Sequence, residues 1–269
     1  MQYFTLELQF KITGIGSASG IIYKDNLLFI ISDNGTFLYQ YDIEKKKLAK
    51  IKLFENGQEN IPKKDKYDFE SICLKENKLY ILGSGSTSKR EKRISYNLQT
   101  KEVKEKDITK LYQKLKNSAA ISDDDLNIEG SLFYNEKWYF FQRGNGANSK
   151  NGVFISNQND NIIFSAIKLP KIKHIETSFT DAILVEEKIY FLATAEDTTS
   201  TYNDGEILGS IIGRLDVQSM QIDFTHKITD THKFEGLTLY NKTKDKIEFL
   251  LCEDNDTEAL ETNIYKLSL

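Results

Sequence analysis

The sequence has few cysteines, few histidines and no long apolar run, and each shortage argues against a class of protein. Among 269 residues there are two cysteines, Cys73 and Cys252, which lie far apart in the apolar segments SICLK and FLLCE. This pattern predicts small core residues in a reducing compartment rather than a disulfide framework, although a secreted protein could pair them. No apolar run reaches the roughly 18 residues that span a bilayer, and the N-terminal MQYFTLELQFKI lacks a basic segment followed by an apolar one. We therefore expect a soluble, cytoplasmic protein without a membrane partner.

An excess of charge of one sign is also missing. The chain has 36 basic and 40 acidic residues, which gives a formal net charge of −4. Nucleic-acid binding usually requires a strong basic surplus, so no nucleic-acid partner is expected. The three histidines form no cluster with the cysteines, which argues against zinc. The glycine-rich GSGSTS precedes a predicted strand and not a helix, so it is not a phosphate-binding loop of the usual kind.

What the sequence does contain is an internal repeat. Five segments share an acid or serine, a short apolar strand, a polar turn, an aromatic-rich strand and a polar loop. The repeat units begin near residues 19, 70, 129, 181 and 235. A third predicted strand follows each polar loop, for example TFLYQYDI and KRISYNL, and the first four units add a fourth strand.

Five units of four short strands predict an all-β fold, a five-bladed β-propeller that forms a single domain over residues 1–269. A four-stranded blade cannot bury both faces without neighbours, so the ring must close. The fifth unit ends at Leu269 after three strands, and we expect the N-terminal strand, Met1 to Ile12, to complete the last blade. Near residues 107–117, four apolar residues recur at helical spacing and predict one short helical insertion.

The repeated acids are predicted to meet at one face of this ring. The start of the first strand and the end of the second lie at the same end of an antiparallel blade. With the first strand innermost, five positions surround the mouth of the central channel: Ser19, Glu70, Glu129, Thr180 or its neighbour Asp181, and Glu235. Converging carboxylates repel each other, and a hard cation relieves that cost. Calcium (Ca²⁺), which takes about 6 to 8 oxygen ligands, is the predicted cofactor; alternatively, each acid only accepts hydrogen bonds from backbone amides.

These segments resemble the calcium-activated nucleotidase (apyrase) family. SGIIYKDNLLFIISDNGTFLYQY is similar to that family's first blade, NIEGSLFYNEKWYFFQRGN to its third and KFEGLTL to its fifth. The resemblance implies calcium contacts at the five positions just given, and nucleotide hydrolysis. Arg143 matches the first of two arginines that the family carries after its third-blade aromatic run, but Gly144 replaces the second. Asn34 stands where an arginine is expected and Ser32 where an acid is expected, so a propeller related to phytase-like esterase domains is equally compatible.

Loops on the same face supply candidates for substrate binding and catalysis. Arginine forks hold phosphate oxygens well, which makes Arg143 and Arg90 predicted phosphate contacts. The further substrate-binding candidates are Asn34 and Ser84, and the candidates for positioning an attacking water are Asp33, Glu196 and Asp197. Ordinary solvated loop charge is the alternative interpretation of these residues.

Two classes of function follow from this pattern. The first is a calcium-dependent phosphohydrolase that acts on a small phosphorylated substrate at the channel mouth. The second is a non-catalytic propeller, in which the central ion clamps the ring and the loops bind a small anionic ligand or a protein.

Overall fold

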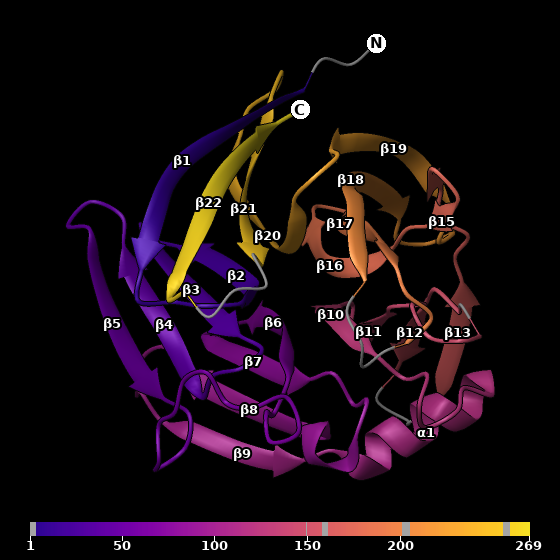
Figure 1. Cartoon of the computed structure of the whole chain (residues 1–269), viewed down its shortest axis with the longest axis horizontal. Coiled ribbons are helices and arrows are strands. Elements are labelled where there is room, and N and C mark those ends of the chain that lie inside the picture. The colour runs from indigo at the N-terminus through magenta and orange to yellow at the C-terminus, as the bar shows by residue number, and fades with distance from the viewer. Residues whose placement is uncertain (1–3, 149, 158–160, 201–204, 255–258) are drawn as a thin grey trace.

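The computed structural model describes residues 4–148, 150–157, 161–200, 205–254 and 259–269. Five antiparallel four-stranded sheets stand around a ring (Figure 1), so the predicted five-bladed propeller is confirmed. The first strands of neighbouring blades contact one another and line the centre, as expected.

Within each blade the strands follow one another from the centre outward. Blade 1 contains β2 (Ala18–Lys24), β3 (Leu27–Ser32), β4 (Phe37–Asp42) and β5 (Lys47–Lys52). Blade 2 contains β6 (Phe69–Lys75), β7 (Lys78–Gly83), β8 (Lys92–Asn97) and β9 (Val103–Asp107), with a 3₁₀ turn at Ser88–Arg90 before β8. Blade 3 contains β10 (Ile128–Tyr134), β11 (Lys137–Gln142), β12 (Gly152–Ser156) and β13 (Ile162–Ala166).

Blade 4 follows a small hairpin of two short strands, β14 (Lys171–Ile172) and β15 (Ile175–Glu176). The blade itself contains β16 (Ser178–Val185), β17 (Lys188–Asp197), β18 (Glu206–Asp216) and β19 (Ile222–Thr229). Blade 5 contains β20 (Lys233–Lys242), β21 (Ile247–Asp254) and β22 (Glu261–Ser268), and its fourth strand is β1 (Thr5–Thr13).

The N-terminal strand closes the ring. β1 pairs antiparallel with β22, in a register that places Thr5 opposite Ser268 and Ile12 opposite Thr262. In Figure 1 the indigo first strand lies beside the yellow last strand. The prediction that this segment completes the last blade is confirmed; its residues 1–3 lie outside the described part of the chain.

Tight turns fix the register of the inner hairpins. In blades 1 to 4 the first and second strands are joined by two residues, such as Asp25–Asn26 and Asn135–Glu136. Both residues of each of these two turns have positive φ, between 46° and 61°. This is the backbone of the two-residue hairpin turn that matches the twist of the strands. Since a slip of one residue would turn every side chain to the other face, these turns help to fix which residues point toward neighbouring blades.

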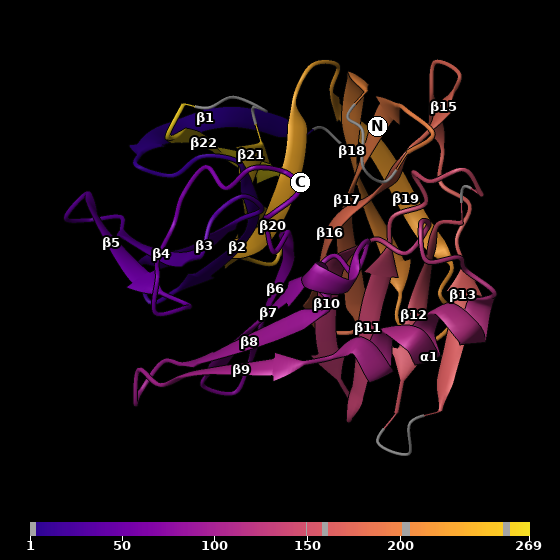
Figure 2. The same ribbon diagram turned by 60° about the horizontal axis from the view of Figure 1, so that its bottom comes forward.

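The hydrophobic core is divided among the spaces between blades. One cluster joins each pair of neighbours, including the pair formed by blades 5 and 1. Between blades 2 and 3 the cluster also takes in helix α1 (Thr109–Ala119), which confirms the predicted helical insertion. Tyr112 of α1 is fully buried, and its hydroxyl donates a hydrogen bond to the carbonyl oxygen of Gly83 at 2.6 Å. The turned view in Figure 2 shows α1 alongside the outer strands of blade 3.

Both cysteines are buried and unpaired, as predicted. Among the described helices, none is long and apolar enough to cross a membrane.

Candidate functional site

A β-bulge interrupts the inner strand of every blade at the same place. The pairing register between first and second strands shifts across one residue in each case, namely Ser19, Glu70, Glu129, Thr180 and Glu235. A bulge leaves its extra residue out of the ladder and re-aims its side chain. The five bulged residues are also buried, so they occupy equivalent positions in the five blades and form one structural series.

The bulges distinguish between Thr180 and Asp181. Thr180 is the bulged residue of blade 4, whereas Asp181 occupies the next, regular position. The two carboxylate oxygens of Asp181 accept hydrogen bonds from the backbone amides of Ala182 and Leu237, both at 2.7 Å. Asp181 therefore joins blade 4 to blade 5, and Thr180 holds the place equivalent to the glutamates. Burial nevertheless raises the pKa of Asp181 well above its usual value.

The two hydroxyl members of the series tie blades together. The Ser19 hydroxyl donates to the carbonyl oxygen of Phe69, and the Thr180 hydroxyl donates to that of Phe234 at 2.7 Å. Each carbonyl belongs to the residue just before the bulged glutamate of the next blade. Blades 1 and 4 thus use the same short link to their neighbours.

All three glutamates of the series are buried, and two of them have incomplete hydrogen bonding. Glu70 Oε2 and Glu129 Oε2 are buried oxygens without a hydrogen-bond partner among the described residues. Burial raises the pKa of Glu70 well above its usual value, and the nearby Glu129 carboxylate raises it further. Burial also raises the pKa of Glu129 and Glu235 despite neighbouring cations. A buried carboxylate in this state must hold a proton or a cation.

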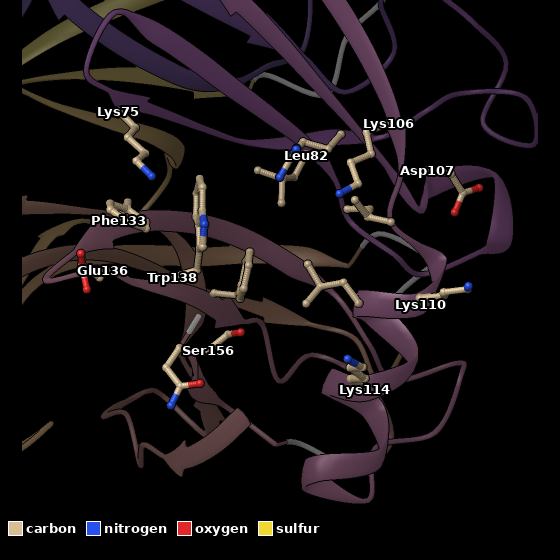
Figure 3. A pocket seen from close by; sticks show the side chains of 15 residues that line it. Lys75, Leu82, Lys106, Asp107, Lys110, Lys114, Phe133, Glu136, Trp138 and Ser156 are labelled. Atoms are coloured by element: carbon tan, nitrogen blue, oxygen red, sulfur yellow. The ribbon is translucent and has the colours of Figure 1, made fainter. Parts of the chain in front are cut away.

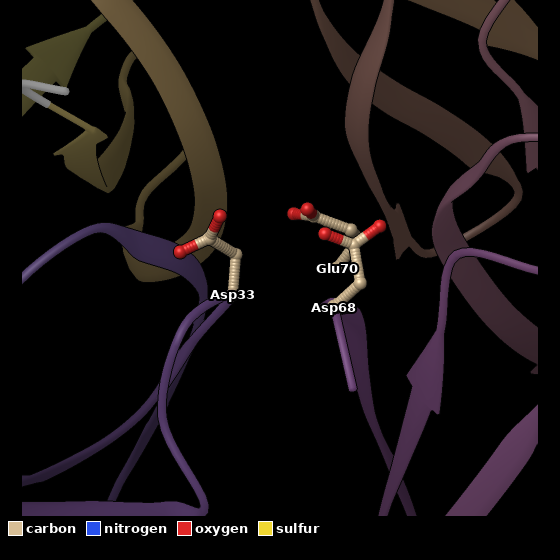
Figure 4. Close-up of side chains that lie close together, drawn as sticks. All are labelled: Asp33, Asp68 and Glu70. Atoms are coloured by element: carbon tan, nitrogen blue, oxygen red, sulfur yellow. The ribbon is translucent and has the colours of Figure 1, made fainter. Parts of the chain in front are cut away.

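Three acids from blades 1 and 2 come together at the channel (Figure 4). Oxygens of Asp33, Asp68 and Glu70 all lie within 4.8 Å of one another. Asp33 follows β3, and its Oδ1 is a third buried oxygen without a partner among the described residues. Burial raises the pKa of Asp33 to about 6, although Lys66 opposes the shift.

Lys66 inserts its ammonium group between two of these acids. It forms ion pairs with Asp33 and, at 2.7 Å, with Asp68 Oδ1. Burial alone would lower the pKa of Lys66, but the carboxylates of Asp68 and Asp33 raise it, so the group stays charged. The protein therefore already supplies one cation on this side of the channel.

Arg90 and Ser84 complete the surroundings of Asp68. Arg90 Nη1 lies 2.7 Å from Asp68 Oδ2, and the Ser84 hydroxyl donates to the same oxygen at 2.5 Å. Arg90 also donates to Ser86 Oγ at 2.7 Å. Burial favours a raised pKa for Asp68, but Lys66 and Arg90 outweigh it and hold the pKa below its usual value. The Arg90 guanidinium is thus buried and bound by protein groups; its role as a phosphate contact stays a prediction.

Arg143 organises the opposite side of the channel. Its guanidinium pairs with Glu196, with Glu129 at 3.3 Å and with Glu235 at 3.7 Å. Its Nε donates to Ser178 Oγ at 3.3 Å. One buried arginine therefore links acids from blades 3, 4 and 5.

The remaining predicted residues lie at the edge of this network. Glu196 is buried, and its second oxygen accepts a hydrogen bond from the Gly205 amide at 2.7 Å. Asp197, by contrast, has a half-exposed side chain, 3.6 Å from His174. Asn34 donates to the Ser17 hydroxyl at 3.2 Å. The structure thus brings Asp33 and Glu196 into the buried network and leaves Asp197 outside it.

Sequence reasoning missed the residues two positions before each bulge. They are all polar and buried: Ser17, Asp68, Asn127, Ser178 and Lys233. Asn127 donates to Glu129 Oε1 at 2.7 Å, and Lys233 pairs with Glu235 at 2.9 Å and with Asp254 at 3.3 Å. A polar residue at this fixed spacing in all five repeats was the available signal.

The channel carries more acid than base. Its seven carboxylates are those of Asp33, Asp68, Glu70, Glu129, Glu196, Glu235 and Asp254. Its four cations are Lys66, Arg90, Arg143 and Lys233. Among the described residues, full ionisation would therefore leave three negative charges uncompensated. The fold and this site define a five-bladed β-propeller with an acid-rich cluster of buried side chains at its centre.

Residues 14–269 match the model of a family described as a family of unknown function (DUF6929), so the chain belongs to that family. A comparison with curated protein sequences finds no match. None of the comparisons links the chain to the nucleotidase family, and that resemblance stays a prediction.

Solved structures with a similar fold include two enzymes and an allergen. The luciferin-regenerating enzyme is 11% identical, with 98% of this chain and 95% of that chain covered and a TM-score of 0.51. Glutaminyl cyclase from Myxococcus xanthus is 8% identical, with 97% and 95% covered and a TM-score of 0.55. The allergen Mala s 1 from Malassezia sympodialis is 10% identical, with 96% and 95% covered and a TM-score of 0.58. At these identities the likeness supports the fold alone.

Proposed function

We propose that the protein is a cation-binding propeller whose central channel holds one divalent ion, Ca²⁺ by the chemistry of its donors. The observation that carries this proposal is a set of three buried carboxylate oxygens without a hydrogen-bond partner in the described part of the chain: Asp33 Oδ1, Glu70 Oε2 and Glu129 Oε2. Buried polar atoms almost always have partners, and a cation is the partner that would also offset the repulsion between these acids.

The donor set favours calcium over other ions. All candidate ligands are oxygens, which suit hard cations, and the channel offers several carboxylates. Calcium accepts irregular shells of about 6 to 8 oxygens, whereas magnesium requires a near-ideal octahedron. The role best supported is structural, because the Ser19 and Thr180 hydroxyls already link blades, while Glu70 Oε2 and Glu129 Oε2 have no partner among the described residues.

Calcium titration tests the proposal. In metal-free protein prepared with chelator, calorimetric titration should show one binding site per chain. At calcium near 100 times the dissociation constant, stabilisation is about 2.7 kcal/mol, which raises the Tm by about 5 to 10 °C in a chain of this size.

Substitutions distinguish calcium binding in the channel from calcium binding elsewhere on the protein. Glu70→Gln should weaken calcium binding about tenfold or more, yet keep or increase stability without calcium because it removes a buried like charge. The matched control is Glu91→Gln, since Glu91 is a buried glutamate paired with Lys116 away from the channel. The proposal fails if millimolar calcium gives no binding heat in the titration and no change in Tm. It also fails if Glu70→Gln binds calcium with the affinity of the wild type.

Calcium-dependent phosphohydrolysis at the same site is the second candidate. Asp33 favours it, because its carboxyl has a pKa of about 6 and one oxygen to which no described residue donates, which suits a general base near neutral pH. A bound cation would supply polarisation of a phosphoryl oxygen or acidification of a water. Arg143 and Arg90, the predicted phosphate contacts, would have to exchange buried carboxylates for phosphate oxygens.

A substrate panel decides between the two roles. Nucleoside di- and triphosphates and simple phosphate esters would be assayed with calcium and with chelator. Turnover that requires calcium, is lost with chelator and is lost in Asp33→Asn even at saturating calcium would establish the hydrolase. Calcium-dependent stabilisation without turnover on any of these substrates would leave the structural role.

A further inference from the structure

A second candidate site lies away from the channel, in a groove between blades 2 and 3. Its volume is 740 Å³, within the range of about 300 to 1,000 Å³ typical of small-molecule sites. Helix α1 and the residue before it form part of its wall, through Ile108 and Leu111. Figure 3 shows the groove with side chains from both blades and from α1 directed around it.

One wall of the groove is basic. Blade 2 and α1 contribute five cationic side chains, namely Lys75, Arg93, Lys106, Lys110 and Lys114, and the groove has two acids, Asp107 and Glu136. The concentration of positive charge is notable in a chain whose overall charge is −4. Asp107 is also engaged elsewhere, because its carboxylate accepts a hydrogen bond from the Thr109 amide at the start of α1.

Arg93 is the central cation of this wall. On β8 it pairs with Leu82 of β7 on one side and with Lys106 of β9 on the other. Arg93 and Lys106 therefore both line the groove from adjacent strands. Its guanidinium stacks over the Tyr80 ring at 5.2 Å, which fixes its position. Arg93 Nε is nevertheless buried without a hydrogen-bond partner among the described residues. An anion in the groove would meet a guanidinium that is already oriented, which favours binding of phosphate oxygens.

The facing wall is aromatic. Phe133, Trp138 and Phe140 of blade 3 line the groove, and the rings of Trp138 and Phe140 are stacked 5.9 Å apart. Figure 3 places Trp138 between Lys75 and Lys106. A ring that enters the groove can therefore stack on an aromatic surface while an attached anion reaches the cations.

We propose that this groove binds a small organic phosphate that carries an aromatic ring, the chemistry of a nucleoside phosphate. The cationic wall recognises the phosphate and the aromatic wall recognises the ring. The proposal is independent of any cation in the central channel, because the groove's lining shares no residue with the acids and cations described there.

The single tryptophan of the chain makes the test direct. Trp138 is the only tryptophan in the sequence, so its fluorescence reports on this groove alone. Adenosine monophosphate is expected to change the emission saturably and to bind at least about tenfold more tightly than adenosine or inorganic phosphate, because it uses both walls. Arg93→Gln and Lys106→Gln should each weaken this binding about tenfold. The matched control is Lys104→Gln, which removes an exposed lysine of the same strand that pairs with Glu102.

Four results would overturn the proposal. They are no response to the nucleotide at millimolar concentration, inorganic phosphate binding as tightly as the nucleotide, unchanged affinity in Arg93→Gln, or a response only to an acidic peptide such as hexaglutamate. Circular dichroism of each variant confirms that the fold is retained. Titration of the wild-type protein alone remains decisive if a variant does not fold.

Discussion

At the scale of single residues, the stability of the channel depends on which group of opposite charge contacts each buried charge. Buried carboxylates are tolerated when an arginine or lysine reaches them, and one arginine here serves three acids. Removing one partner of a buried pair is costly because the remaining charge stays out of water. Removing one partner of a channel ion pair should therefore cost much more stability than removing one partner of a surface ion pair.

Arg143→Gln should lower the free energy of unfolding by about 3 to 5 kcal/mol, because it leaves buried acids from three blades without their shared cation. Urea denaturation at neutral pH without calcium measures this loss. Arg214→Gln is the matched control, since Arg214 pairs with Asp223 near the surface and should cost no more than about 1 kcal/mol. Similar losses in both variants would contradict the importance assigned to Arg143.

A pH dependence is expected at Glu248 on β21. Hydrogen bonds from Lys246 and Asn241 lower its pKa from 4.5 to about 2. A carboxyl with a lowered pKa stabilises the folded state above its unfolded pKa, and this contribution is lost as pH falls toward the folded value. Glu248→Gln should therefore destabilise the protein at pH 7, and the difference from wild type should shrink between about pH 4.5 and 2. Denaturation curves over this range test it; a difference that is constant with pH would refute it.

At the scale of elements, the blades could be predicted from the sequence, whereas the network of ion pairs in the channel could not. Alternating apolar residues and two-residue turns are local signals, so the five hairpins and the missing strand of blade 5 could be predicted. The bulged positions were predictable because they recur, although Thr180 and Asp181 could not be told apart without the register. Lys66 was not predictable, since it lies in the non-repeating connection between β5 and β6 and its partners are set only by packing.

Strand β1 offers a clean test of ring closure. Ile12 is 1% exposed in the cluster between blades 5 and 1, whereas Leu8 on the same strand is 56% exposed. Ile12→Ala should cost about 2 to 5 kcal/mol of stability through lost burial and a cavity. Leu8→Ala should stay within about 0.5 kcal/mol of wild type, as surface changes usually do. Equal effects, measured by urea denaturation, would show that β1 does not seal this interface as described.

At the scale of the whole molecule, the ring combines apolar contacts between blades with charges along its axis. Each space between blades has its own hydrophobic cluster, and the axis is spanned by ion pairs that cross from blade to blade. The described acids outnumber the described cations there. Stability should therefore respond to any positive charge that enters the channel, whether it is a side chain or a metal ion.

Lys66→Met tests this balance for the whole ring. The substitution removes the ammonium that pairs with Asp33 and Asp68, so a larger unpaired negative charge is buried and the Tm without calcium should fall. Calcium should then raise the Tm more than it does in wild type, because the ion can neutralise the acids that Lys66 served. The control is Lys89→Met, since Lys89 pairs with Asp65 at the surface and its loss should alter neither the Tm nor the calcium response appreciably. An unchanged calcium response in Lys66→Met would mean that the ion and the ammonium do not share these acids, and would limit the candidate site to Glu70 and Glu129.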